Sequence, residues 1–146
     1  MDDLRELYQQ LILDHNQNPQ NFRSIENATS EVNGHNPLCG DEITLFLMVE
    51  NDIVIDVSFM GSGCAISKAS ASIMTTIIKG KTVREAEKIF EQFHAMITTG
   101  ETTGDMGKLA VLAGVHKFPS RVKCAVLSWH TMINALHGHT ELTTTE

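Results

Sequence analysis

The chain has 146 residues, of which 42% are hydrophobic and 20% are charged, and its formal net charge is −7. This length and composition fit one globular domain, and the acidic balance argues against binding to nucleic acid or anionic membranes, which requires clustered positive charge. The acidic N-terminus and the lack of a long apolar run predict a soluble, cytoplasmic protein without a signal peptide or membrane span. Three cysteines are an odd number for a disulfide framework, which leaves metal binding, sulfur chemistry or core packing.

Apolar side chains recur at helical spacing in four segments. They predict helices over residues 2–14, 64–80, 82–96 and 119–136. Gly80 marks the end of the second helix, and Pro119 opens the fourth. Thr82 and Glu85 predict a capping box at the start of the third helix.

Two runs of alternating apolar and polar residues, 42–50 and 53–60, predict an antiparallel hairpin of half-buried strands. A polar connection rich in glycine and threonine is expected near residues 98–107. We expect a single domain over residues 1–138 and a frayed C-terminal tail over residues 139–146.

The register of the hairpin determines where the thiols lie. Pairing Val49 with Ile53 across a three-residue turn puts the apolar side chains of both strands on one face. The same register carries Cys39 and Asp41 to the face that the helices cover. It also places Cys64 one residue beyond the position opposite Cys39, so we expect these two thiols to meet at the open end of the hairpin.

The third thiol belongs to the last helix. Cys124 lies off the apolar stripe of that helix, which indicates a role other than core packing. Arg121 and Lys123 flank it as supporting positive charge, and Cys64 begins its own helix, so both thiols are expected to ionise readily. Cys39 lies in a loop and is expected to be the thiol most accessible to a partner.

Three thiolates and one carboxylate, from Cys39, Asp41, Cys64 and Cys124, match the four ligands that tetrahedral zinc takes. Taken singly, each cysteine is more often a small buried hydrophobe than a ligand, and the aspartate could be a turn residue. Their predicted convergence favours a metal site.

Three segments that contain these residues resemble a known family. NPLCGD at 36–41, GSGCAISKASAS at 61–72 and FPSRVKCAVLSWH at 118–130 are similar, in order and spacing, to the cysteine segments of the iron-sulfur cluster assembly proteins that include IscU and the N-terminal part of NifU. The resemblance extends from the N-terminal helix to Leu136. It implies an α+β fold, with a small antiparallel sheet covered on one face by helices. It implies the metal ligands Cys39, Asp41, Cys64 and Cys124.

Two departures separate the chain from the scaffold members of this family. Scaffolds carry a histidine immediately before the third cysteine, where this chain has Lys123, and a Leu-Pro-Pro-Val-Lys motif, where it has KFPSRVK at 117–123. The connection GDMGKLAVLAGVHKFPS at 104–120 is similar to the insertion that marks the SufU branch, whose members bind zinc and accept sulfur from a cysteine desulfurase.

The resemblance therefore implies a zinc-dependent sulfurtransferase or sulfur carrier of iron-sulfur cluster assembly. Such a protein serves as the second substrate of a SufS-type cysteine desulfurase, takes persulfide sulfur on Cys39, and supplies downstream iron-sulfur assembly proteins.

Two other functions stay open. A scaffold could assemble a transient [2Fe-2S] cluster on the same residues, because cysteine and aspartate also bind iron. Alternatively, a structural zinc site could stabilise a domain whose only role is to interact with other proteins.

Overall fold

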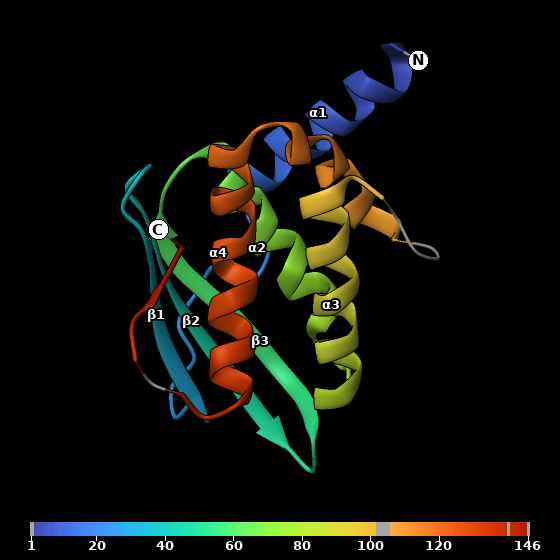
Figure 1. Ribbon diagram of the computed structural model, residues 1–146. Coiled ribbons are helices and arrows are strands. Elements are labelled where there is room, and N and C mark those ends of the chain that lie inside the picture. Colours follow the sequence, from blue (N-terminus) through green and yellow to red (C-terminus); the bar gives the residue numbers. More distant parts are fainter. Residues whose placement is uncertain (1, 102–105, 140, 146) are drawn as a thin grey trace.

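A four-stranded sheet forms one layer of the fold, and helices cover one of its faces (Figure 1). The computed structural model describes residues 2–101, 106–139 and 141–145. The elements are α1 (Asp2–Gln17), β1 (Ser30–Asn36), β2 (Asp41–Glu50), β3 (Ile53–Ser62), α2 (Ala65–Ile78), α3 (Val83–Thr99), the 3-10 helix η1 (Gly107–Lys117), α4 (Pro119–Leu136) and β4 (Thr143–Thr144). The strands lie in the order β3-β2-β1-β4, with β4 parallel to β1 and the other pairs antiparallel. This arrangement confirms the predicted α+β class.

The four predicted helices are present, and their local signals act as expected. The Thr82 side chain accepts a hydrogen bond from the Glu85 amide at 3.0 Å, and the Glu85 carboxylate accepts one from the Thr82 amide at 3.0 Å, which completes the predicted capping box. Gly80 follows α2 with a φ of 88°, and Pro119 is the first residue of α4.

The region between α3 and α4 contains η1, which the sequence does not predict. Of the connection expected near residues 98–107, residues 102–105 lie outside the described residues, as do the first two residues of the SufU-like insertion at 104–120.

Strand β1 has the sequence SEVNGHN, in which Val32 is the only large apolar residue, and this explains why no apolar alternation predicts the strand. Its inward side instead fits closely against α4. A Cβ atom on Gly34 would collide with the side chain of Thr131, so this glycine permits the helix to lie directly on the strand.

The C-terminal tail is expected to be frayed, but part of it is a strand. Thr143 and Thr144 pair in parallel with Gly34 and His35 of β1, and the Thr145 amide donates to the His35 carbonyl at 3.3 Å. Backbone pairing with the open edge of β1 therefore orders a polar segment that has no apolar pattern of its own. Residues 140 and 146 of the tail lie outside the described residues.

The turn between β2 and β3 is shorter than expected, and the predicted pairing of Val49 with Ile53 is wrong. Glu50 pairs with Ile53, and only Asn51 and Asp52 form the turn. Both turn residues have positive φ, 52° and 63°, which is the backbone conformation of a two-residue type I′ hairpin turn.

A bulge between Met48 and Val49 then changes which β3 residues face the core. Val54 is fully buried, whereas Ile53 and Ile55 are 40% and 41% exposed. The prediction that both isoleucines point inward is therefore wrong, because the bulge interrupts the regular alternation at this end of β3.

Beyond the bulge, the register is shifted by two residues. Gly61 pairs with Ile43, where the expected register has it opposite Asp41. An even shift preserves the face on which each side chain lies, so Asp41 still points to the helix-covered face, as its 0% exposure shows.

Helices α2 and α4 are joined by a buried contact close to the third cysteine. The Trp129 indole donates to Ser70 Oγ at 3.1 Å, and Ser70 Oγ donates to the Ala125 carbonyl at 2.6 Å. The Trp129 ring also stacks on Phe93 of α3, with ring centroids 4.4 Å apart. These contacts fix the first half of α4, and with it Cys124, against the rest of the core.

None of the described helices combines the length and the apolar character that crossing a membrane requires.

Candidate metal centre

Two thiols and a carboxylate meet where the β1–β2 turn approaches the start of α4. The Sγ atoms of Cys39 and Cys124 and a carboxylate oxygen of Asp41 all lie within 4.8 Å of one another. The Cys124 thiol donates to Cys39 Sγ at 3.3 Å. Three of the four predicted ligands, which are separated by up to 85 positions in the sequence, are thus brought together by the fold.

Asp41 is the first residue of β2 and is fully buried. Its Oδ1 accepts a hydrogen bond from the Cys64 amide at 2.8 Å, and its Oδ2 accepts one from Asn36 Nδ2 at 3.2 Å. Within the described residues, no lysine, arginine or histidine forms an ion pair with this carboxylate. A buried carboxylate without a cationic partner is costly, and a bound metal ion would offset that cost.

Cys64 lies beside this group and does not belong to it. It is the N-cap of α2, where its Sγ accepts a hydrogen bond from the Ser67 amide at 3.4 Å. Its backbone is tied to Asp41, and its thiol is near enough to Cys124 to help raise the pKa of that residue.

Cys124 is more deeply buried than its sequence position indicates. Its exposed fraction is 2%, and all six residues from Cys124 through Trp129 are buried, so this part of α4 is covered on every side, including the side away from the apolar stripe. Burial is the main cause that raises the pKa of this thiol above its ordinary value, and contacts with Cys39, Asp41 and Cys64 add to the effect. The expectation that Cys124 ionises readily is therefore wrong for the protein without a metal ion.

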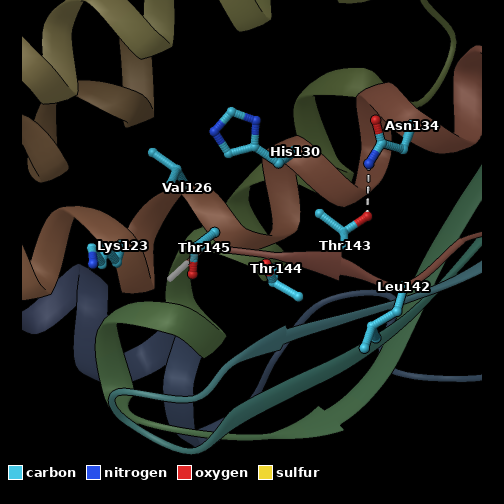
Figure 2. A pocket seen from close by; sticks show the side chains of 8 residues that line it. All are labelled: Lys123, Val126, His130, Asn134, Leu142, Thr143, Thr144 and Thr145. Atoms are coloured by element: carbon cyan, nitrogen blue, oxygen red, sulfur yellow. Dashed lines mark hydrogen bonds between the residues drawn. The ribbon is translucent and has the colours of Figure 1, made fainter.

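The two basic residues beside Cys124 point elsewhere. Arg121 is exposed, and its guanidinium lies over the Phe118 ring, 4.7 Å from the ring centroid. Lys123 lines a hollow of about 460 Å³ between α4 and β4, together with His130 and the threonines of the tail (Figure 2). Within the described residues, neither side chain forms an ion pair with Asp41.

Asn36 is a site residue that the sequence does not single out. It is fully buried at the end of β1, and its side chain contacts both Asp41 and Cys124. The only signal in the sequence is its place as the first residue of NPLCGD, and nothing there indicates a contact with a helix 88 positions further along.

Gly63 offers a test of how tightly the site is packed. A Cβ atom at this position would lie 2.5 Å from Asp41 Oδ1, so Gly63→Ala should displace the carboxylate and lower the metal affinity by about 10- to 100-fold. Gly114→Ala is the control, because nothing lies within 4 Å of a Cβ there. Competition with a chromogenic zinc chelator measures the affinities, and equal values for the two variants would contradict this account of the packing.

The fold and this donor group define the class of protein. A small helix-covered sheet with clustered thiols and a carboxylate at one end is the arrangement predicted for an iron-sulfur cluster assembly domain. Residues 7–125 match the family described as NifU-like N terminal domain, and the chain belongs to that family.

Relatives in this family are proteins of iron-sulfur cluster assembly. The chain is 44% identical over 128 residues to the zinc-dependent sulfurtransferase SufU of Bacillus subtilis, with 86% of each chain covered. It is 40% identical over 133 residues to the scaffold protein IscU of Thermotoga maritima, covering 89% of this chain and 92% of the relative. A crystal structure from Fervidobacterium islandicum, described as a scaffold protein for the SUF system, superposes with a TM-score of 0.82 at 37% identity and covers 86% and 93% of the two chains. The predicted family is confirmed.

Proposed function

We propose that this protein is a zinc-dependent sulfur carrier that takes persulfide sulfur from a SufS-type cysteine desulfurase onto Cys39. The observation that carries the proposal is the buried Asp41 carboxylate, which lies within 4.8 Å of two thiols and has no cationic partner among the described residues. The 44% identity to a zinc-dependent sulfurtransferase supports the same function for this protein.

The donor set suits zinc. Thiolates and a single carboxylate are preferred by a borderline-soft divalent ion, whereas magnesium and calcium prefer oxygen ligands. We assign Cys39, Asp41, Cys64 and Cys124 as the four ligands, with the Cys64 side chain turning toward the other three. When bound, zinc would keep these thiols deprotonated.

Cys39 is the residue suited to accept sulfur. It is exposed on the β1–β2 turn, whereas Cys64 is partly buried and Cys124 is buried. Its thiolate attacks the outer sulfur of the desulfurase persulfide, a new S–S bond forms on Cys39, and the desulfurase cysteine leaves as a thiolate. Sulfur then passes to downstream iron-sulfur assembly proteins. Three free thiols are compatible with the reducing cytoplasm, where we place this activity.

A scaffold that assembles a [2Fe-2S] cluster is the second candidate, and the 40% identity to a protein named as scaffold IscU favours it. Lys123 argues against it, because the position that precedes the third cysteine offers a lysine in place of the expected histidine. Anaerobic incubation with iron and sulfide separates the two functions. A stable visible chromophore that passes to an apo-acceptor supports the scaffold, whereas bound zinc together with faster desulfurase turnover supports the sulfur carrier.

A purely structural zinc site predicts a third pattern. Zinc would then raise the melting temperature without any effect on desulfurase turnover. Metal analysis and a turnover assay on the wild-type protein, together with the anaerobic incubation with iron and sulfide, therefore distinguish all three functions.

Asp41→Asn tests the non-sulfur ligand. The change is isosteric, so the fold should persist. An amide has only one oxygen and no negative charge, so it cannot accept hydrogen bonds from both Asn36 and the Cys64 amide as the carboxylate does, and it is a weaker metal ligand. We expect zinc to be released to a chelator at least about 10-fold more readily, with a parallel fall in desulfurase stimulation. Identical release and identical stimulation in the two proteins would remove Asp41 from the ligand set.

A further inference from the structure

We infer that Asn36 is a positioning residue that makes Cys124 a weaker nucleophile than Cys39 and so favours Cys39 as the sulfur acceptor. This inference rests on the proposed function. It explains why one cysteine of the site, and not another, accepts the sulfur.

One buried side chain contacts three separate parts of the site. Asn36 Nδ2 donates to Asp41 Oδ2 at 3.2 Å and to Cys124 Sγ at 3.5 Å. Its Oδ1 accepts a hydrogen bond from the Leu38 amide at 3.3 Å, immediately before Cys39. Asn36 has no exposed surface, so no water competes for these bonds. It therefore holds the carboxylate, the buried thiol and the β1–β2 turn in a fixed arrangement.

The three thiols differ in the donors that reach them. Cys124 Sγ accepts from the Asn36 amide, and Cys64 Sγ accepts from the backbone amide of Ser67 at 3.4 Å. Among the described residues, no N–H group donates to Cys39 Sγ, whose recorded hydrogen-bond partner is the Cys124 thiol. When the sulfurs are all thiolates on a bound metal, an N–H donor withdraws charge from the sulfur that it reaches, and that sulfur is then a weaker nucleophile than one without such a donor.

Position 36 requires a side chain that donates to Asp41 and Cys124 and accepts from the Leu38 amide, and asparagine does this where residues of similar size do not. Leucine has nearly the same size and no donor, whereas aspartate would place a second carboxylate beside Asp41. The side chain must donate on one side and accept on the other, and an amide does both without carrying charge.

The test compares Asn36→Leu with Asn33→Leu. Asn33 lies on the same strand and is exposed, and its Oδ1 accepts from Thr44 Oγ1 at 2.7 Å away from the thiols. We expect Asn36→Leu to lower zinc affinity by about 10- to 100-fold in a chelator competition, and Asn33→Leu to leave it unchanged. In the proteins loaded with cobalt(II) alone, the sulfur-to-cobalt charge-transfer band should move to lower energy in Asn36→Leu only, because one thiolate has lost its N–H donor.

The cobalt spectrum separates positioning from a merely structural role. A weaker zinc affinity with an unmoved band would overturn the inference, as would wild-type values for both measurements. If Asn36→Leu yields little folded protein, Asn36→Ser replaces it in the same two measurements, because its shorter hydroxyl does not reach Cys124. Failure of the wild-type protein to bind zinc or accept sulfur would instead refute the proposed function, so the two failures are distinguishable.

Discussion

Replacing Cys39 with serine is expected to reduce the stimulation of a cysteine desulfurase to the level measured without this protein. A serine hydroxyl stays protonated at neutral pH and does not attack a persulfide, and the remaining thiols cannot substitute. Cys124 is only 2% exposed, and Cys64 is partly buried at the N-cap of α2. Because Cys39 itself is exposed, the metal-free fold should tolerate the change.

Desulfurase turnover with saturating cysteine measures this effect. Met60→Ser is the matched control, since it removes an exposed sulfur-containing side chain from β3 at a position outside the thiol group. The control should stimulate like the wild-type protein. Equal stimulation by Cys39→Ser would show that sulfur is accepted elsewhere.

Replacing Cys124 with serine should remove the stabilisation that zinc provides. A site saturated at 1,000 times its Kd stabilises the folded state by about 4 kcal/mol, which corresponds to roughly 10 °C in Tm for a domain of this size. Serine is a poor zinc ligand, so the variant should lose most of this shift. Without zinc, the two proteins should melt at similar temperatures, because the hydroxyl is small enough for the buried position beside Asn36.

Thermal melts with and without zinc measure the shift. Ser128→Ala on the same helix is the control, because Ser128 is 1% exposed and its Oγ has no hydrogen-bond partner among the described residues. That variant should keep the full zinc-dependent shift. A Cys124→Ser protein that gains as much Tm from zinc as the wild type would exclude this thiol from the ligand set.

The helices could be predicted from local signals because each signal acts within one turn. The capping box of Thr82 and Glu85 depends on residues three positions apart, and Pro119 acts on the helix that it begins. Strands β1 and β4 could not be predicted in this way, since their pairing partners and not their side chains order them.

The sequence predicts that Cys39, Asp41 and Cys124 lie together even though its hairpin register is wrong by two residues, and it also predicts Cys64 in this group, which the structure places beside it. Beyond the bulge, an even error leaves each side chain on its predicted face, so Asp41 is still directed inward. A one-residue error would have turned it toward the solvent. The burial of Cys124 and the contacts of Asn36 depend on how closely α4 approaches β1. Gly34 permits this close approach, and the apolar periodicity of the sequence does not predict it.

Mapping the position of transferred sulfur tests the central claim most directly. The zinc-loaded wild-type protein is incubated with a cysteine desulfurase and free cysteine, alkylated, digested without reductant and analysed by mass spectrometry. We expect one added sulfur atom on the peptide that contains Cys39 and none on the peptides that contain Cys64 or Cys124. Added sulfur on either of those two cysteines, or an unmodified Cys39 after the desulfurase has turned over, would contradict the assignment of this protein as a sulfur carrier that acts through Cys39.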